Sequence, residues 1–239
     1  MTWWIGCAGW AIPQAAAARF PGAGSHLERY ARVLPAVEVD SSFYRYHEPG
    51  TYARWAASVP AMFRFAVKLP REITHFHRLT HVAAPLRRFL TTVRPLGKKL
   101  GPLLVQLPPS LVFDARRAAA FFAGLRRRHR GPVACEPRHA SWFDGAADAS
   151  LSRFHVARVG ADPACVPAAA EPGGWARLVY YRLHGSPRMY YSAYGDEYLR
   201  ELAGDIRRRA RGTAVWCIFD NTAVGAATQN ALQLLDLLA

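Results

Sequence analysis

Short apolar runs alternate with segments of helical periodicity along the whole chain. Each run has the length of a strand, and its side chains would point alternately to two faces of a sheet. The runs predict eight strands, at Trp3–Ala8, Ala36–Asp40, Phe63–Leu69, Leu103–Leu107, Val133–Glu136, Ala157–Gly160, Val179–His184 and Val215–Phe219.

The intervening segments carry apolar residues at helical spacing. Leu86, Phe89, Leu90 and Val93 form such a stripe. The predicted helices are His26–Leu34, Thr51–Val59, Pro85–Leu96, Ala115–Arg128, Asp196–Arg209 and Val224–Leu238. Asp114 is expected to cap the fourth of them, and Ser141 is expected to cap a further helix before the sixth strand. The stretch 162–176 is rich in proline, glycine and alanine, so we expect no regular helix there.

Eight strand–helix alternations within 239 residues predict an α/β fold, a (β/α)8 TIM-type barrel formed by one domain over residues 1–239. A doubly wound open sheet is the alternative. That fold often carries a Gly-x-Gly-x-x-Gly turn after its first strand, and this sequence has none there.

Polar residues share one face of several predicted strands. Val37 and Val39 alternate with Glu38 and Asp40, and the other strands repeat the pattern. If the apolar sets pack against helices, the polar sets point into the barrel near the carboxyl ends, where this fold builds its active sites. The side chains predicted to point inward are Glu38, Asp40, Lys68, Gln106, Glu136, Arg138, Arg182 and His184. For Glu38 and Arg182 the alternative is an ion-pair network that only stabilises the barrel.

Three of these residues are candidate catalytic groups. Glu136 and His184 are predicted at strand ends and are suited to proton transfer near neutral pH. Lys68 is a candidate base or Schiff-base nucleophile if nearby cations and burial lower its pKa. The alternative for Lys68 is an ion pair with Glu38 or Glu136.

Cationic and aromatic residues cluster in the segments after the strands. Arginine grips phosphate or carboxylate groups in bidentate fashion, and aromatic rings supply walls for a base or a sugar. The predicted ligand-binding residues are Trp10, Asp40, Tyr44, Arg71, His75, Gln106, Arg138, Arg182, Tyr190, Tyr191 and Asn221. For the tyrosines a packed loop lid is the alternative.

The chain carries a formal net charge of +14, and 28 of its 31 basic residues are arginine. This balance favours anionic ligands, but a GC-rich genome produces the same arginine bias without selection for nucleic-acid binding. Cys7, Cys135 and Cys217 lie in apolar runs and are expected to be reduced core thiols, with Cys165 in a loop. Together with the lack of a signal peptide or membrane-spanning run, this predicts a cytoplasmic protein without membrane partners.

Six motifs occur in a fixed order along the chain. They are Val-Glu-Val-Asp-Ser-Ser-Phe-Tyr (37–44), Phe-Ala-Val-Lys-Leu-Pro-Arg-Glu-Ile-Thr-His (65–75), Leu-Gly-Pro-Leu-Leu-Val-Gln-Leu-Pro-Pro-Ser (100–110), Cys-Glu-Pro-Arg-His-Ala-Ser-Trp-Phe (135–143), Tyr-Arg-Leu-His-Gly (181–185) and Phe-Asp-Asn-Thr-Ala-Val-Gly-Ala-Ala-Thr-Gln-Asn-Ala (219–231). Together they closely resemble the domain-of-unknown-function family 72, the YecE-like proteins. The resemblance implies a TIM-type barrel and supplies no established activity. One departure is Asp220-Asn221, where the family usually has Asn-Asn.

The same resemblance implies a distant similarity to the barrel of AP endonuclease IV, which makes nucleic acid a candidate ligand and zinc a candidate metal. A zinc cluster needs several histidines and carboxylates. This chain offers His184, Glu136, Asp162 and Asp220 on separate strands, while His75 and its neighbour at 77 form a His-x-His only in a loop. We therefore predict no zinc cluster and no cofactor, and leave open a weak divalent-metal site.

Three functional hypotheses follow. The first is an enzyme of hydrolase or lyase type that acts on a phosphate-bearing or otherwise anionic small molecule or nucleotide. In it, Glu136 and His184 move protons, Lys68 and the three arginines at 71, 138 and 182 hold the anion, and Gln106 and Asn221 orient the substrate. The second is a protein that binds or processes nucleic acid through the same residues and the basic surface. The third is a ligand-binding sensor without catalysis. The sequence predicts no oligomeric state.

Overall fold

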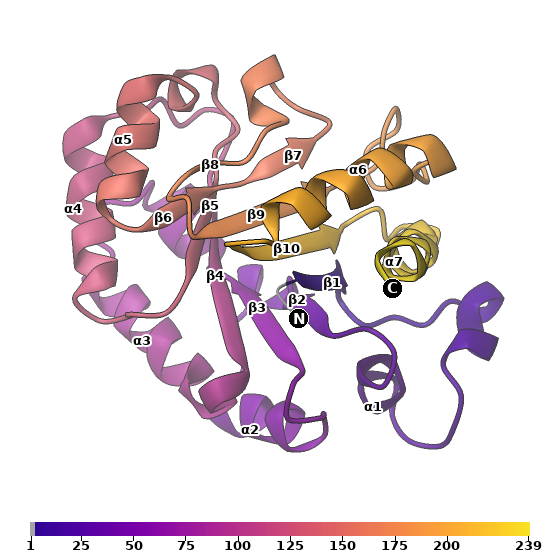
Figure 1. Ribbon diagram of the computed structural model, residues 1–239. Coiled ribbons are helices and arrows are strands. Elements are labelled where there is room, and N and C mark those ends of the chain that lie inside the picture. The colour runs from indigo at the N-terminus through magenta and orange to yellow at the C-terminus, as the bar shows by residue number, and fades with distance from the viewer. Residues whose placement is uncertain (1–2) are drawn as a thin grey trace.

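The strands form a closed parallel barrel. A computed structural model describes residues 3–239, and Figure 1 shows the strands in the middle with helices around them. The strands are β1 Trp3–Ala8, β2 Ala36–Val39, β3 Arg64–Lys68, β4 Leu100–Gln106, β5 Val133–Glu136, β6 Val156–Arg158, β7 Gly160–Asp162, β8 Gly173–Gly174, β9 Leu178–Leu183 and β10 Ala214–Phe219.

The strand order is β7-β9-β10-β1-β2-β3-β4-β5-β6-β8, and every pairing is parallel except that of β6 with the short β8. The ring closes because β6 and β7 are one continuous segment. Its first half pairs with β5 and its second half with β9, and Val159 joins the two halves. The predicted TIM-type barrel is confirmed. Its sixth barrel strand consists of β6 and β7 with Val159 between them, and it pairs with both neighbours.

Helices connect most successive strands of the barrel. They are α1 His26–Ala31, α2 Pro49–Ala57, α3 Ala83–Val93, α4 Ala115–Arg126, α5 Gly145–Arg153, α6 Asp196–Arg209 and α7 Ala226–Leu238. Asp114 caps α4 as predicted, since its carboxylate accepts from the Arg117 N–H at 2.8 Å. The prediction for Ser141 is wrong: Asp144 caps α5, and the Ser141 hydroxyl instead accepts from the backbone N–H of Phe113. Between β7 and β9 the chain forms no α-helix, as expected.

Strand alternation divides the apolar residues into two cores. One set, with Val37, Phe65 and Val105, packs against the helices. The other set, with Ala66 and Leu104, fills the inside of the barrel. Because successive side chains of a strand point to opposite faces, this separation confirms the predicted assignment of apolar residues to the helix side.

Large and small side chains complement each other inside the barrel. The indole of Trp216 stacks on Trp4, with ring centroids 5.6 Å apart, and on Tyr180 at 6.0 Å. Opposite these rings, the interior positions of four strands are alanines, namely Ala36, Ala66, Ala134 and Ala157. The aromatic rings occupy the volume that the alanines leave free, so the lower half of the interior is a packed apolar layer.

Within residues 3–239 we find no helix whose length and apolar character would let it cross a bilayer.

Candidate active site at the carboxyl end of the barrel

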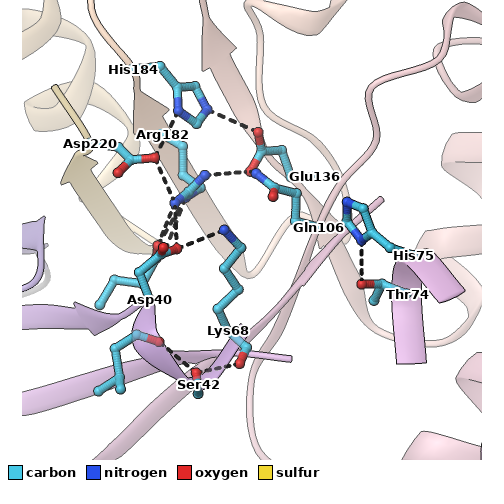
Figure 2. A network of polar contacts seen from close by, with 12 residues as sticks. Asp40, Ser42, Lys68, Thr74, His75, Gln106, Glu136, Arg182, His184 and Asp220 are labelled. Atoms are coloured by element: carbon cyan, nitrogen blue, oxygen red, sulfur yellow. Dashed lines mark hydrogen bonds and ion pairs between the residues drawn. The ribbon is translucent and has the colours of Figure 1, made fainter. Parts of the chain in front are cut away.

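Arg182 of β9 lies at the centre of a buried polar layer above the aromatic rings. Its Nη2 donates to Glu38 Oε1 at 2.6 Å and to Asp220 Oδ2 at 3.1 Å, and its Nη1 donates to Glu136 Oε2 at 2.9 Å. The Tyr180 hydroxyl donates to Glu38 Oε2 at 2.7 Å. Figure 2 shows Arg182, Glu136, His184 and Asp220 converging from different parts of the barrel. We call Glu38, Glu136, Arg182, His184 and Asp220 the Arg182 network.

Burial distinguishes Arg182 from the residues that a ligand can reach. Its side chain is 0% exposed, and carboxylates surround its guanidinium. Burial alone would lower the pKa of Arg182. The surrounding acids have the larger effect and raise that pKa well above its ordinary value. Arg182 thus lies beneath the mouth, which is our term for the carboxyl end of the barrel. It positions the carboxylates around it, and the structure does not place it in contact with bulk solvent.

The imidazole of His184 lies between two carboxylates. Its Nε2 is 3.0 Å from Glu136 Oε1, and its Nδ1 is 3.0 Å from Asp220 Oδ2. Burial alone would lower the pKa of His184, but the two carboxylates outweigh it and raise that pKa. Burial would raise the pKa of Glu136, yet Arg182, His184 and Arg138 hold it well below its usual range. This geometry favours an imidazolium flanked by two carboxylates.

Charge counting leads to the same protonation state. The interacting acids are Glu38, Asp40, Glu136 and Asp220, and the permanent cations are Lys68, Arg138 and Arg182. With all four acids ionised, they outnumber the permanent cations by one, and a protonated His184 restores the balance. Burial raises the pKa of Glu38, however, and Arg138 Nη2 lies 3.2 Å from His184 Nε2. Because uncompensated buried charge is costly, the cluster as a whole stabilises the imidazolium.

Asp220 completes the His184 site, and sequence reasoning did not select it as a site residue. Its side chain faces Arg182 and His184. Burial would raise the pKa of Asp220, but these two cations have the larger effect and lower it. The sequence signal that could have identified this residue is that Asp220 stands where the family usually has asparagine. The structure shows that the carboxylate at this position accepts from a guanidinium and faces an imidazole.

Lys68 forms a second ion pair at the mouth. Its Nζ donates to Asp40 Oδ1 at 2.7 Å and lies 4.3 Å from the centroid of the Phe43 ring. Its partner is therefore Asp40, and neither Glu38 nor Glu136 takes that place, contrary to the alternative considered from sequence. The Ser42 hydroxyl donates to the Lys68 carbonyl at 2.6 Å and fixes the end of β3. Asp40 is partly exposed, so this pair borders solvent.

A single π-helical turn, Glu72–Phe76, follows β3; it carries the predicted ligand-binding residue His75, and the predicted Arg71 directly precedes it. Burial lowers the pKa of His75, and the charges of Lys68, Arg138 and Arg71 lower it further, which keeps the imidazole neutral near pH 7. Arg71 is exposed, with its guanidinium 5.7 Å from the centroid of the Tyr44 ring. The turn thus brings a neutral imidazole and an exposed cation to the mouth.

Two pockets open at the mouth. One, of about 290 Å³, is lined by Glu136, Arg138, His184 and Cys165, together with prolines and alanines. Arg138 donates to Glu136 Oε1 through Nε and Nη2 at 3.1 and 3.0 Å and remains 23% exposed. The predicted Glu136, Arg138 and His184 therefore meet in one cavity. Cys165, which sequence reasoning left in a loop, lies on its wall.

The other pocket, of about 570 Å³, lies over β1 and β2. It is lined by Trp10, Asp40, Tyr44 and Glu38, among others. Trp10 packs edge-on against Trp55, while Tyr44 is 64% exposed. Gln106 is separate from this pocket and donates to Glu136 Oε2 at 2.9 Å.

The loop after β9 covers His184 with aromatic rings. The Tyr190 ring lies edge-on to the His184 imidazole, with centroids 6.0 Å apart, and Tyr190 is 40% exposed. Tyr191 is 41% exposed and packs under the guanidinium of Arg188 at 3.9 Å. Tyr190 thus borders the imidazole of His184 directly, whereas Tyr191 contacts Arg188.

Asn221 lies behind this loop and is fully buried. Its Nδ2 donates to the Ser192 carbonyl at 2.9 Å and to Asn230 Oδ1 at 3.0 Å, while its Oδ1 has no hydrogen-bond partner among the described residues. Asn221 therefore ties the tyrosine loop to α7, and its predicted contact with a substrate stays a prediction.

In the part of the chain from residue 3 onward, no group of three or more His, Cys, Asp or Glu side chains has an arrangement that could hold a metal ion. Arg182 and Arg138 occupy the space between the carboxylates where a cation would otherwise bind.

Comparison with known proteins places the fold in a family. The family model described as "Protein of unknown function DUF72" matches residues 4–239. The protein YecE of Escherichia coli (strain K12) is 35% identical over 82 residues, which are 34% of this chain and 30% of that protein. The aligned part therefore spans less than a third of that relative's length.

Solved structures agree over the full length. A DUF72 family protein from Enterococcus faecalis V583 superposes with a TM-score of 0.82 and 22% identity, covering 99% of this chain and 95% of that one. A DUF72 family protein from Thermotoga maritima MSB8 gives a TM-score of 0.81 and 22% identity, covering 100% and 99%. The chain thus belongs to the DUF72 family of proteins of unknown function.

Proposed function

We propose that the protein is an enzyme that binds a phosphate-bearing or otherwise anionic small molecule at the mouth and catalyses proton transfer during its hydrolysis or elimination. The observation that carries the proposal is the imidazole of His184, held between Glu136 and Asp220 at the wall of a 290 Å³ pocket beside Arg138. An imidazolium fixed in this way is prepared to act as a general acid.

Each residue has a role that its position supports. Arg138 is partly exposed and lines the pocket, so it is the residue best placed to grip an anion, with Arg71 and Lys68 adding positive charge at the rim. His184 donates a proton to the leaving group and regains one from solvent in the pocket, and Glu136 orients the imidazole through its 3.0 Å contact with Nε2. Arg182 supports Glu136 from below and does not touch the ligand.

The test uses inorganic phosphate and a panel of small phosphomonoesters. Binding is measured by calorimetry and turnover by release of phosphate or loss of the ester. Glu136→Gln is expected to keep binding within about threefold and to lose turnover by about 10² or more. Arg138→Gln, which alters a partly exposed side chain, should weaken binding about tenfold or more.

Arg200→Gln provides the matched control, because it removes an exposed arginine from α6 without touching the mouth. It should change neither binding nor turnover. A panel in which no anion binds, or turnover that survives Glu136→Gln unchanged, would contradict the proposal. Unfolding curves of each variant show whether a loss of activity is a loss of fold.

A further inference from the structure

A third pocket, of about 500 Å³, lies at the opposite end of the barrel from the mouth. It is lined by residues at the starts of strands, among them Trp4 of β1, Arg64 of β3, Leu178 of β9 and Ala214 of β10. In parallel strands the amino ends lie on the face away from Glu136 and His184. We call this cavity the amino-end pocket. None of the proposed catalytic residues contributes to it.

Aromatic rings form its walls. Trp216 is 3% exposed and stacks on Trp4, while Trp4 and Trp175 are only half-buried. Gly101 permits this arrangement, because a Cβ at that position would lie 2.6 Å from the Trp216 ring. A side chain there would push the indole out of its place between β4 and Trp4. The pocket therefore presents flat indole surfaces on which a planar ring can stack.

Four arginines surround these rings, at positions 64, 126, 130 and 177. No aspartate or glutamate from residues 3–239 lines the cavity. Arg126 donates to the carbonyls of Phe154 and His155, at 2.7 and 2.6 Å, and meets no carboxylate. Arg130 and Arg177 are exposed and, within the described chain, form no hydrogen bond or ion pair. Their charges are available to a ligand.

We propose that the amino-end pocket binds a planar aromatic ring that carries a phosphate or carboxylate group and has about the size of a mononucleotide. The ring stacks on Trp4 and Trp175, and the anionic group meets the guanidinium groups of Arg130 and Arg177. The volume lies within the range of small-molecule sites, roughly 300–1,000 Å³. Arginine suits the anionic group because its planar fork matches phosphate and carboxylate geometry. This proposal is independent of the function proposed for the mouth.

Calorimetry with adenosine 5′-monophosphate tests it, with adenosine and ribose 5-phosphate as probes that each lack one half of the recognised group. The monophosphate should bind at least about tenfold more tightly than either fragment. The double variant Arg130→Gln/Arg177→Gln should weaken its binding about tenfold or more. Trp175→Ala should weaken it by a similar factor, and Trp175→Phe should restore most of the loss.

The matched control is Arg127→Gln/Arg211→Gln, which removes two exposed arginines from the same end of the barrel outside the pocket. It should leave affinity within about twofold. Loss of binding on Arg138→Gln but not on Arg130→Gln/Arg177→Gln would move the ligand to the mouth and overturn the proposal. So would binding of single-stranded oligonucleotides alone, weakened equally by the control variant, because that result describes a diffuse basic surface.

Discussion

Arg182 and Glu38 are 144 residues apart in sequence and form a buried ion pair in which neither side chain is exposed to solvent. The guanidinium contacts both carboxylate oxygens of Glu38, with a shortest distance of 2.6 Å, and also reaches Glu136 and Asp220. One cation thus joins β2, β5, β9 and the residue after β10. The same arginine that links these strands by ion pairs also fixes the carboxylates on either side of His184.

Removing this cation should destabilise the whole barrel. Arg182→Met leaves several carboxylates buried without their partner, and breaking a buried pair in this way costs about 3–5 kcal/mol. The free energy of unfolding, measured with urea, should fall by that amount. Arg19→Met breaks an exposed pair with Asp236 and should cost at most about 1 kcal/mol. Equal losses in the two variants would show that the network contributes nothing beyond a surface ion pair.

Tyr30 bridges two neighbouring strands with its hydroxyl. The hydroxyl accepts from the Cys7 N–H at 2.8 Å and donates to the Ala36 carbonyl at 3.0 Å, and all three groups are buried. Tyr30→Phe therefore leaves a buried donor and a buried acceptor unpaired, and we expect a loss of about 1–3 kcal/mol in unfolding free energy.

The control for this substitution is Tyr44→Phe, because Tyr44 is 64% exposed and its hydroxyl makes no hydrogen bond among residues 3–239. It should change stability by less than about 0.5 kcal/mol. If Tyr30→Phe were equally neutral, a water or a shift of β1 against β2 would have to replace the hydroxyl.

Much of this architecture could be predicted from the sequence because strand alternation is a local property. The opposite parities of Val37 and Glu38 correctly place one against the helices and the other inside the barrel. The carboxyl-end clustering of Glu136 and His184 also follows, since parallel strands align their ends.

What the sequence leaves open depends on distances between strands. No local sequence pattern indicates that Lys68 pairs with Asp40, or that β6 and β7 together form the sixth barrel strand and close the ring. The position of Cys165 on the wall of the mouth pocket likewise depends on the fold of the loop after β7. Such contacts are decided by packing among segments far apart in sequence.

Cys165 offers a direct probe of the mouth. It is the only exposed thiol in the described chain, since Cys7, Cys135 and Cys217 are buried. Iodoacetamide should modify Cys165 alone in the native protein and all four cysteines in urea, as peptide mass spectrometry will show. Because Cys165 shares a pocket with Arg138, bound phosphate or phosphomonoester should slow the reaction.

Cys165→Ser is the control for this experiment, since it should abolish native labelling and keep ligand binding. Native modification of Cys7, Cys135 or Cys217 at a comparable rate would mean that the barrel opens far more readily than its closed core suggests.

Titration of His184 should couple the stability of the protein to pH. Its folded pKa is raised above the unfolded value of about 6.5, so the stabilisation from the imidazolium is complete below that pH and is lost as pH rises through the folded pKa. The melting temperature should therefore fall on this alkaline limb. His184→Gln should remove the dependence while leaving the acid limb that comes from the lowered pKa values of Glu136 and Asp220.

Asp220→Asn tests what raises the pKa of His184. The substitution keeps an oxygen that can accept from Arg182 but removes the negative charge 3.0 Å from His184 Nδ1, and it recreates the asparagine pair implied by the family resemblance. The folded pKa of His184 should drop, because one of the two carboxylates that raise it is gone. The imidazole carbon-bound protons report this pKa by NMR titration. An unchanged pKa would assign the shift to Glu136 alone, and the balance of four carboxylates against four cations would no longer describe the site.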